Sequence, residues 1–135
     1  MYNHILIPVD LGAQTDYAQA ATVARALLAP KGRLTLLHVI EPIPIYAQSY
    51  IVPDFETSTR DAARTAMNDL AQSLGVQNTA IVIGSAGRSI VTWAQENDAD
   101  CIVIASHTPG LSNIVMGSTA TWIVKHSPTA LHVLR

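Results

Sequence analysis

Three short segments of the chain combine polar and glycine residues in a way that suits an anionic small molecule. The first, Pro8-Val9-Asp10, ends in a carboxylate that can accept hydrogen bonds from a ribose or from the amino group of a base. The second is Gly84-Ser85-Ala86-Gly87, and the third runs from Ala105 to Thr119. Asp10 also has a purely structural interpretation, since an aspartate that ends a strand often caps a loop.

The third segment is the most informative, because Gly117-Ser118-Thr119 stands just before an apolar helical stripe. The first N–H groups of a helix lack intrahelical partners and carry partial positive charge, which suits a phosphate. The same residues are also an ordinary helix cap, and capping is favoured when they are taken alone. Neither a P-loop nor a G-x-G-x-x-G fingerprint follows any apolar run, so a flavin or nicotinamide dinucleotide is disfavoured.

Five short apolar runs must position these segments. Most are nearly continuous in Ile, Val and Leu, a pattern typical of parallel strands that are covered on both faces. The last run is more mixed and fits a strand at the edge of a sheet. The five predicted strands are His4–Val9, Leu34–Ile40, Thr79–Ile83, Cys101–Ala105 and Ala130–Leu134.

Helical periodicity fills the intervals between the runs. The first stripe extends from Tyr17 to Leu28, with Thr15 as the expected N-cap and Pro30 followed by Gly32 as a stop signal. Three further helices are predicted from apolar stripes. They cover Ala63–Leu74, Ile90–Ala94 and Ala120–Val124, the last stopped by Ser127–Pro128.

This alternation of strands and helices predicts an α/β fold, a five-stranded parallel sheet with helices on both faces, in one domain over residues 1–135. Ligands of open parallel sheets bind beyond the carboxyl ends of the strands, which is where all three polar segments fall. The irregular segment Glu41–Pro53 carries three prolines and several apolar residues. It can pack onto the domain, or serve as a ligand lid or a partner surface.

Composition narrows the functional classes. Of 135 residues, 49% are hydrophobic and only 13% charged, which predicts a folded core and argues against disorder. The net charge of −2 lacks the basic face that nucleic-acid binding requires. The lone Cys101 permits no internal disulfide. Because Pro8 and Asp10 interrupt the first apolar stretch, no signal peptide is predicted, and no apolar run could span a membrane. A cytoplasmic location is expected.

The residues also resemble the universal stress protein family along the whole chain. Ile5-Leu6-Ile7-Pro8-Val9-Asp10 is similar to its opening strand and Leu37-His38-Val39-Ile40 to its second. Ile102–His107, Gly117-Ser118, His126-Ser127-Pro128 and the terminal Leu131–Arg135 are similar to its last third. The resemblance implies a Rossmann-like sheet of strand order 3-2-1-4-5.

The nucleotide motif of this family is G-x2-G-x9-G-[ST]. Here Ala105 and Thr108 replace the first two glycines, and eight residues separate Thr108 from Gly117. The stretch Ala-Ser-His-x-Pro is similar to a branch of the family that binds adenine nucleotide, and Pro109 presets the turn in the shortened spacer.

The resemblance implies ATP or AMP as ligand, with Mg²⁺ able to accompany the phosphates. Pro8, Val9 and Asp10 would contact the adenine and ribose, and Val39 the face of the adenine. Ile104 and Ala105 would lie under the ribose. The phosphates would lie near Ser106, His107 and Thr108 and against Gly117, Ser118 and Thr119. His107 could add positive charge there, or it could simply face water.

The resemblance further implies a homodimer that pairs through Thr129–Leu134, which would cover an exposed sheet edge. Three functions follow: a nucleotide-occupied stress-response or signalling module, an interaction protein with an empty, degenerate site, and a slow ATP hydrolase. The first is preferred, and no dedicated enzyme is expected, because no G-x-S-x-G elbow or oriented Ser-His pair accompanies Ser85, Ser106 or Ser118.

The remaining candidate residues are interpreted as structural. Cys101 is expected to be an inert thiol inside a buried strand. Three histidines lie in predicted strands without metal-ligand spacing, and two tryptophans are expected to pack on the sheet or at the dimer surface. These residues are His4, His38, His132, Trp93 and Trp122.

Overall fold

Five parallel strands form one sheet in the order β3-β2-β1-β4-β5, which confirms the predicted α/β class and strand order. The structure is a computed structural model that describes residues 1–12, 15–44, 46–47, 54–105 and 117–135. The strands are β1 (Tyr2–Pro8), β2 (Leu28–Ile40), β3 (Asn78–Ile83), β4 (Cys101–Ala105) and β5 (Ala130–Leu134). The helices are α1 (Tyr17–Leu27), α2 (Phe55–Leu74), α3 (Ala86–Glu96) and α4 (Ser118–His126).

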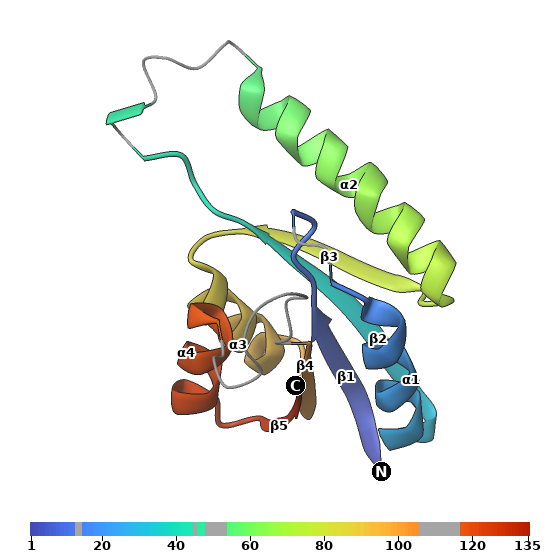
Figure 1. Cartoon of the computed structure of the whole chain (residues 1–135). Coiled ribbons are helices and arrows are strands. Elements are labelled where there is room, and N and C mark those ends of the chain that lie inside the picture. Colours follow the sequence, from blue (N-terminus) through green and yellow to red (C-terminus); the bar gives the residue numbers. More distant parts are fainter. Residues whose placement is uncertain (13–14, 45, 48–53, 106–116) are drawn as a thin grey trace.

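Helices cover both faces of this sheet, so that two separate cores form (Figure 1). Alternate residues of β1 serve opposite cores: Ile5 and Ile7 pack under α1 and α2, and Leu6 packs under α3 and α4. All three side chains are fully buried. Because strands covered on both faces need apolar residues at every position, the continuous aliphatic runs of β1 and β4 are explained.

The first helix begins later than predicted. Asp16, not Thr15, is its N-cap, because the Asp16 Oδ1 atom accepts a hydrogen bond of 2.9 Å from the N–H of Ala18. Thr15 instead lines the pocket described below. The prediction that Thr15 caps the helix is therefore wrong: both types can cap, and the backbone geometry at Asp16 decided between them.

Strand β2 also differs from its prediction. The helical stripe was expected to include Leu28, and Pro30 and Gly32 were expected to stop the helix, but β2 begins at Leu28 and contains both residues. Leu28 pairs with Tyr2 of β1, and the register then shifts before Arg33 pairs with His4. A proline, which has no N–H to donate, is tolerated at such an irregularity. The helix thus ends before Pro30 and Gly32, as predicted, and pairing with β1 draws Leu28, which the stripe had included, into the strand.

The remaining elements lie close to their predicted places. Helix α2 begins eight residues before the predicted stripe, and α4 ends at the C-cap Ser127, as predicted from Ser127–Pro128. Strand β5 lies at the edge of the sheet, as its mixed sequence indicated. Cys101 is buried, and this burial raises the pKa of its thiol to about 11, in keeping with an unreactive group. None of the helices in the described ranges is long and apolar enough to cross a membrane.

Two of the three strand histidines have structural contacts. His4 is buried at the amino end of β1. Its ring makes an edge contact with the ring of Trp93, and the two ring centroids lie 5.9 Å apart. His38 contacts the β1 loop, as described below, and His132 is exposed on β5. Trp122 packs on the core under α3 and α4 and stacks on His126 at 4.0 Å. Within the described residues, no group of three or more His, Cys, Asp or Glu could hold a metal ion.

Candidate functional site

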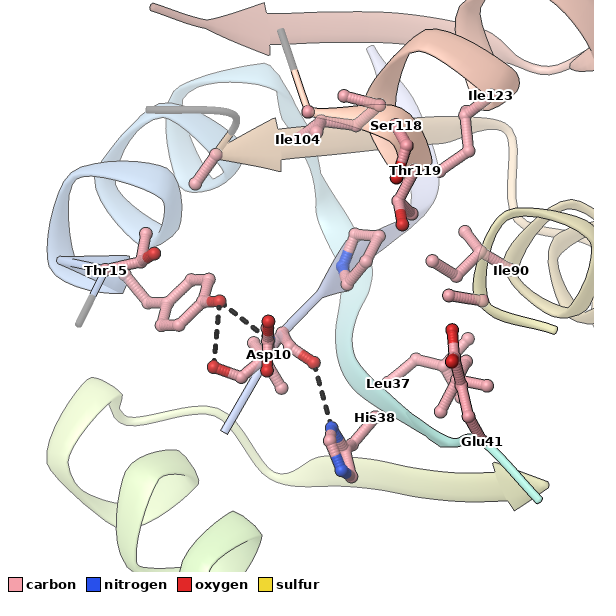
Figure 2. Close-up of a pocket in the computed structure, with 18 residues that line it drawn as sticks. Asp10, Thr15, Leu37, His38, Glu41, Ile90, Ile104, Ser118, Thr119 and Ile123 are labelled. Atoms are coloured by element: carbon pink, nitrogen blue, oxygen red, sulfur yellow. Dashed lines mark hydrogen bonds between the residues drawn. The ribbon is translucent and has the colours of Figure 1, made fainter. Parts of the chain in front are cut away.

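A pocket of about 490 Å³ lies beyond the carboxyl ends of β1, β2 and β4 (Figure 2). The pocket lies at the topological switch point of the sheet. From β1 the strand order runs to β2 and β3 on one side and to β4 and β5 on the other. This is the place where open parallel sheets bind their ligands. The described residues that line it are Pro8, Val9, Asp10, Thr15, Tyr17, Leu37, His38, Val39, Glu41, Ala86, Ile90, Ile104, Ala105, Gly117, Ser118, Thr119, Ala120 and Ile123.

Asp10 is held in place by Tyr17 of α1. The backbone N–H of Asp10 donates to the Tyr17 hydroxyl oxygen at 2.7 Å, and the hydroxyl points back to the Asp10 carbonyl at 3.5 Å. The Asp10 Oδ1 atom accepts from the N–H of Gly12 at 3.0 Å. Burial raises the pKa of Tyr17, so this hydroxyl stays protonated and continues to brace the loop at neutral pH. The carboxylate itself remains exposed to the pocket.

His38 fixes the other side of the same loop. Its Nδ1 atom lies 3.1 Å from the carbonyl oxygen of Val9, which can only accept, so Nδ1 carries the hydrogen. The N–H of Val9 donates to the carbonyl of Leu37 at 2.8 Å. The Val9 side chain is buried in the core with α1 and α2. Val9 therefore offers a ligand mainly its backbone, and Pro8 before it also lines the pocket.

One wall of the pocket is apolar. Leu37 and Val39 of β2, Ile90 of α3 and Ile104 of β4 reach it from the core under α3 and α4. These side chains come from three separate segments of the chain and enclose a surface without polar groups of their own. Such a wall suits the flat, largely apolar face of an aromatic ring.

The beginning of α4 forms the opposite end of the pocket. Gly117 is the N-cap and makes no side-chain capping bond, and the first helical bond runs from the N–H of Thr121 to the Gly117 carbonyl. The sequence-based preference for a helix cap is confirmed for Gly117, which is the N-cap, whereas Ser118 and Thr119 are the first two residues of the helix. The first N–H groups of a helix have no partner within the helix, so the start of α4 presents to the pocket the kind of donors that bind anions.

The second polar segment contributes less than its sequence suggested. Only Ala86 of Gly84–Gly87 lines the pocket, and Ser85 is the N-cap of α3 without a side-chain capping bond. Gly87 has a structural role instead. A Cβ atom there would lie 3.0 Å from the Trp122 ring, so the glycine allows α3 and α4 to approach closely.

Nine of the lining residues lie outside the predicted set, and they include Thr15, Tyr17 and Glu41. Thr15, the Tyr17 hydroxyl and Glu41 line the pocket, although the sequence patterns had assigned the first two to helix formation and Glu41 to the irregular loop. A polar residue directly after the apolar run of β2 was the signal that could have pointed to Glu41. The predicted Ser106, His107 and Thr108 lie outside the described residues, as does most of the Glu41–Pro53 segment beyond Pro44. The other nine predicted site residues all line this pocket.

Comparison with models of protein families identifies the family of this chain. The model of the universal stress protein family matches residues 1–135. The chain belongs to the universal stress protein family. Universal stress protein G of Salmonella typhimurium is 26% identical to it over 142 residues, and the match covers all of both chains. The resemblance seen in the sequence is confirmed.

Solved structures of universal stress proteins show the same fold. Universal stress protein UspA from Lactobacillus plantarum superimposes with a TM-score of 0.73 at 27% identity, covering 99% of this chain and 98% of that one. A universal stress protein solved in complex with cAMP superimposes with a TM-score of 0.61 at 24% identity, covering 99% and 97%. The shared fold extends over the entire sheet that builds the pocket.

Proposed function

We propose that this universal stress protein binds ATP or AMP in the pocket at the carboxyl ends of β1, β2 and β4, and acts as a homodimeric stress-response or signalling module. The observation that carries the proposal is the joining, in one pocket, of an apolar wall, the Asp10 carboxylate and the first turn of α4. These three features match the base, the ribose and the phosphates of a nucleotide. A universal stress protein that superimposes on this chain was solved in complex with cAMP, an adenine nucleotide, which supports the proposal.

The charge distribution in the pocket favours phosphate binding by backbone groups. Among the described lining residues there is neither lysine nor arginine. The phosphates would therefore depend on the N–H groups of Ser118 and Thr119, on the partial positive charge of the helix end, and on Mg²⁺ brought with the nucleotide. Asp10 would accept hydrogen bonds from the ribose at the opposite side, away from the anionic groups.

Nucleotide retained by the purified protein tests the proposal. We expect denatured protein to release ATP or AMP in near-stoichiometric amount, measured by chromatography of the supernatant. Adding Mg·ATP to nucleotide-free protein at about a hundred times the dissociation constant should raise the free energy of unfolding by about 2.7 kcal/mol. If the purified protein retains no nucleotide and is not stabilised by millimolar Mg·ATP, the proposal is contradicted. That outcome would favour an interaction protein with an empty site.

Catalysis is not part of the proposed function beyond slow ATP hydrolysis. The pocket offers the Asp10 and Glu41 carboxylates among its described residues, but the binding features account for the whole arrangement. Turnover well above about one per minute, lost on changing Asp10 or Ser118, would instead indicate a true ATP hydrolase, since dedicated enzymes typically turn over at about 10 s⁻¹.

The proposed dimer uses the outer edge of β5, where an uncovered strand would otherwise invite aggregation. Antiparallel pairing centred on this five-residue strand would bring His132 next to its own copy across the two-fold axis. We expect light scattering at micromolar concentration to give twice the mass of the chain. His132→Glu should shift this mass toward the monomer, because it sets two carboxylates opposite each other. A monomeric wild type would contradict the dimer; Gln72→Glu on α2 is the control.

A further inference from the structure

Glu41 enters the pocket as the continuation of a row of side chains on β2. Successive residues of a strand point to opposite faces, so Leu37, Val39 and Glu41 share one face. Leu37 and Val39 pack in the core under α3 and α4. Glu41 comes directly after Ile40, the last residue of β2, and so stands where this apolar row leaves the sheet. Figure 2 shows its side chain extending from the end of β2 toward Ile90 of α3.

The surroundings of this carboxylate are apolar on the side that faces the pocket. Leu37, Val39 and Ile90 line the same wall, so a flat ring lying against them would have its edge near Glu41. An ionised carboxylate can only accept hydrogen bonds. It favours a ring that presents an amino group at this edge, and a hydrogen bond to a charged acceptor is stronger than one between neutral groups.

The two described carboxylates of the pocket differ in how they are held. Asp10 lies on the side of α1, where its Oδ1 atom already accepts from the N–H of Gly12 and its backbone is braced by Tyr17. Glu41 approaches from the side of β2 and α3 (Figure 2). A ligand that spans the pocket would therefore meet the two carboxylates at different groups, Asp10 at the sugar and Glu41 at the base.

We propose that Glu41 is a specificity-determining residue that accepts a hydrogen bond from the exocyclic amino group of the bound purine. The inference rests on the proposed nucleotide function and deepens it: the pocket selects a 6-aminopurine over a purine without that donor. Glu41 acts on the choice of base alone, and the sugar and phosphates are held by the groups described above.

The test compares ATP with purine riboside triphosphate, which lacks only the 6-amino group. Dissociation constants are measured on nucleotide-free wild type, Glu41→Ala and Glu41→Gln. We expect the wild type to bind ATP more tightly by roughly tenfold or more, the range of a hydrogen bond to a charged group. In Glu41→Ala the two ligands should bind equally. Glu41→Gln, which keeps a neutral acceptor, should give an intermediate ratio.

The ratio of the two dissociation constants separates this effect from general electrostatics, because removing a negative charge changes the affinity for both triphosphates alike. Glu96→Gln, at the exposed end of α3, is the matched control and should leave the ratio unchanged. A ratio near one in the wild type, or an equal ratio in wild type and Glu41→Ala, would overturn the role of Glu41 while leaving nucleotide binding intact. If the wild type binds neither triphosphate, the proposed function itself fails.

Discussion

Replacing Gly117 by valine is expected to abolish nucleotide retention while leaving the fold intact. Gly117 has φ −64° and ψ 162°, a conformation that any residue adopts. No described atom lies within 4 Å of the position that a Cβ atom would take. Packing against the described residues therefore does not require glycine at this position. A phosphate that reaches the N–H groups of the first turn would collide with the added side chain, and we expect affinity for Mg·ATP to fall at least about a hundredfold, or some 2.7 kcal/mol.

The measurement is the nucleotide content of the purified variant, together with its dissociation constant for Mg·ATP. Because valine is a poorer N-cap than glycine, the free energy of unfolding should fall by no more than about 1 kcal/mol. Gly117→Ala, with a single methyl group, should give a smaller loss of affinity. Thr121→Val adds a branched apolar residue to α4 outside the pocket lining and should retain nucleotide. Normal nucleotide content in Gly117→Val would exclude phosphate binding at this helix end.

The second large effect is expected for His4, far from the pocket at the amino end of β1. Its Nδ1–H donates to the Asn97 carbonyl at 3.0 Å, and its Nε2 accepts from the Thr35 hydroxyl at 2.8 Å. Both His4 and Thr35 are buried. His4→Phe keeps the ring and its contact with Trp93 but removes both hydrogen bonds and leaves the Thr35 hydroxyl unpaired. We expect the free energy of unfolding to fall by about 2 to 4 kcal/mol in denaturant titrations.

The same residue makes stability depend on pH. Burial lowers the pKa of His4 below its usual value, against the hydrogen bond to the Asn97 carbonyl and the charge of Asp100, which raise it. The folded protein thus binds fewer protons than the unfolded chain. Stability is full above the unfolded pKa of about 6.5 and is lost as pH falls from there through the folded pKa.

His4→Phe should therefore remove the loss of stability that the wild type shows between neutral pH and the folded pKa of His4. The control is His126→Phe, which changes an exposed histidine on α4 and should alter stability far less. Asp100 does not contribute in this pH range, because its pKa lies below the usual value of an aspartate. Partial burial raises the pKa of Asp100, but the N–H donors of Asn3 and His4 outweigh burial and lower it overall. An unchanged pH profile in His4→Phe would show that another group carries the dependence.

The sequence alone determined the fold class and much of the site. Continuous aliphatic runs alternating with helical stripes leave few arrangements other than a parallel sheet covered on both faces. Since the carboxyl ends of such strands meet at one edge, the order of the runs is enough to predict that Asp10, Ala105 and Gly117 lie together. Their side chains and backbone do line one pocket.

Only the tertiary structure decided the element bounds and the roles of several polar groups. Leu28, which the helical stripe had included, joined β2 because it pairs with Tyr2 of β1. The Tyr17 hydroxyl reaches Asp10, and Glu41 reaches the wall of Leu37 and Ile90, through contacts that the chain makes only after it has folded. Periodicity reports which face of an element is buried. It does not report which groups from different elements then come within hydrogen-bonding distance, because that depends on register and packing across the whole sheet.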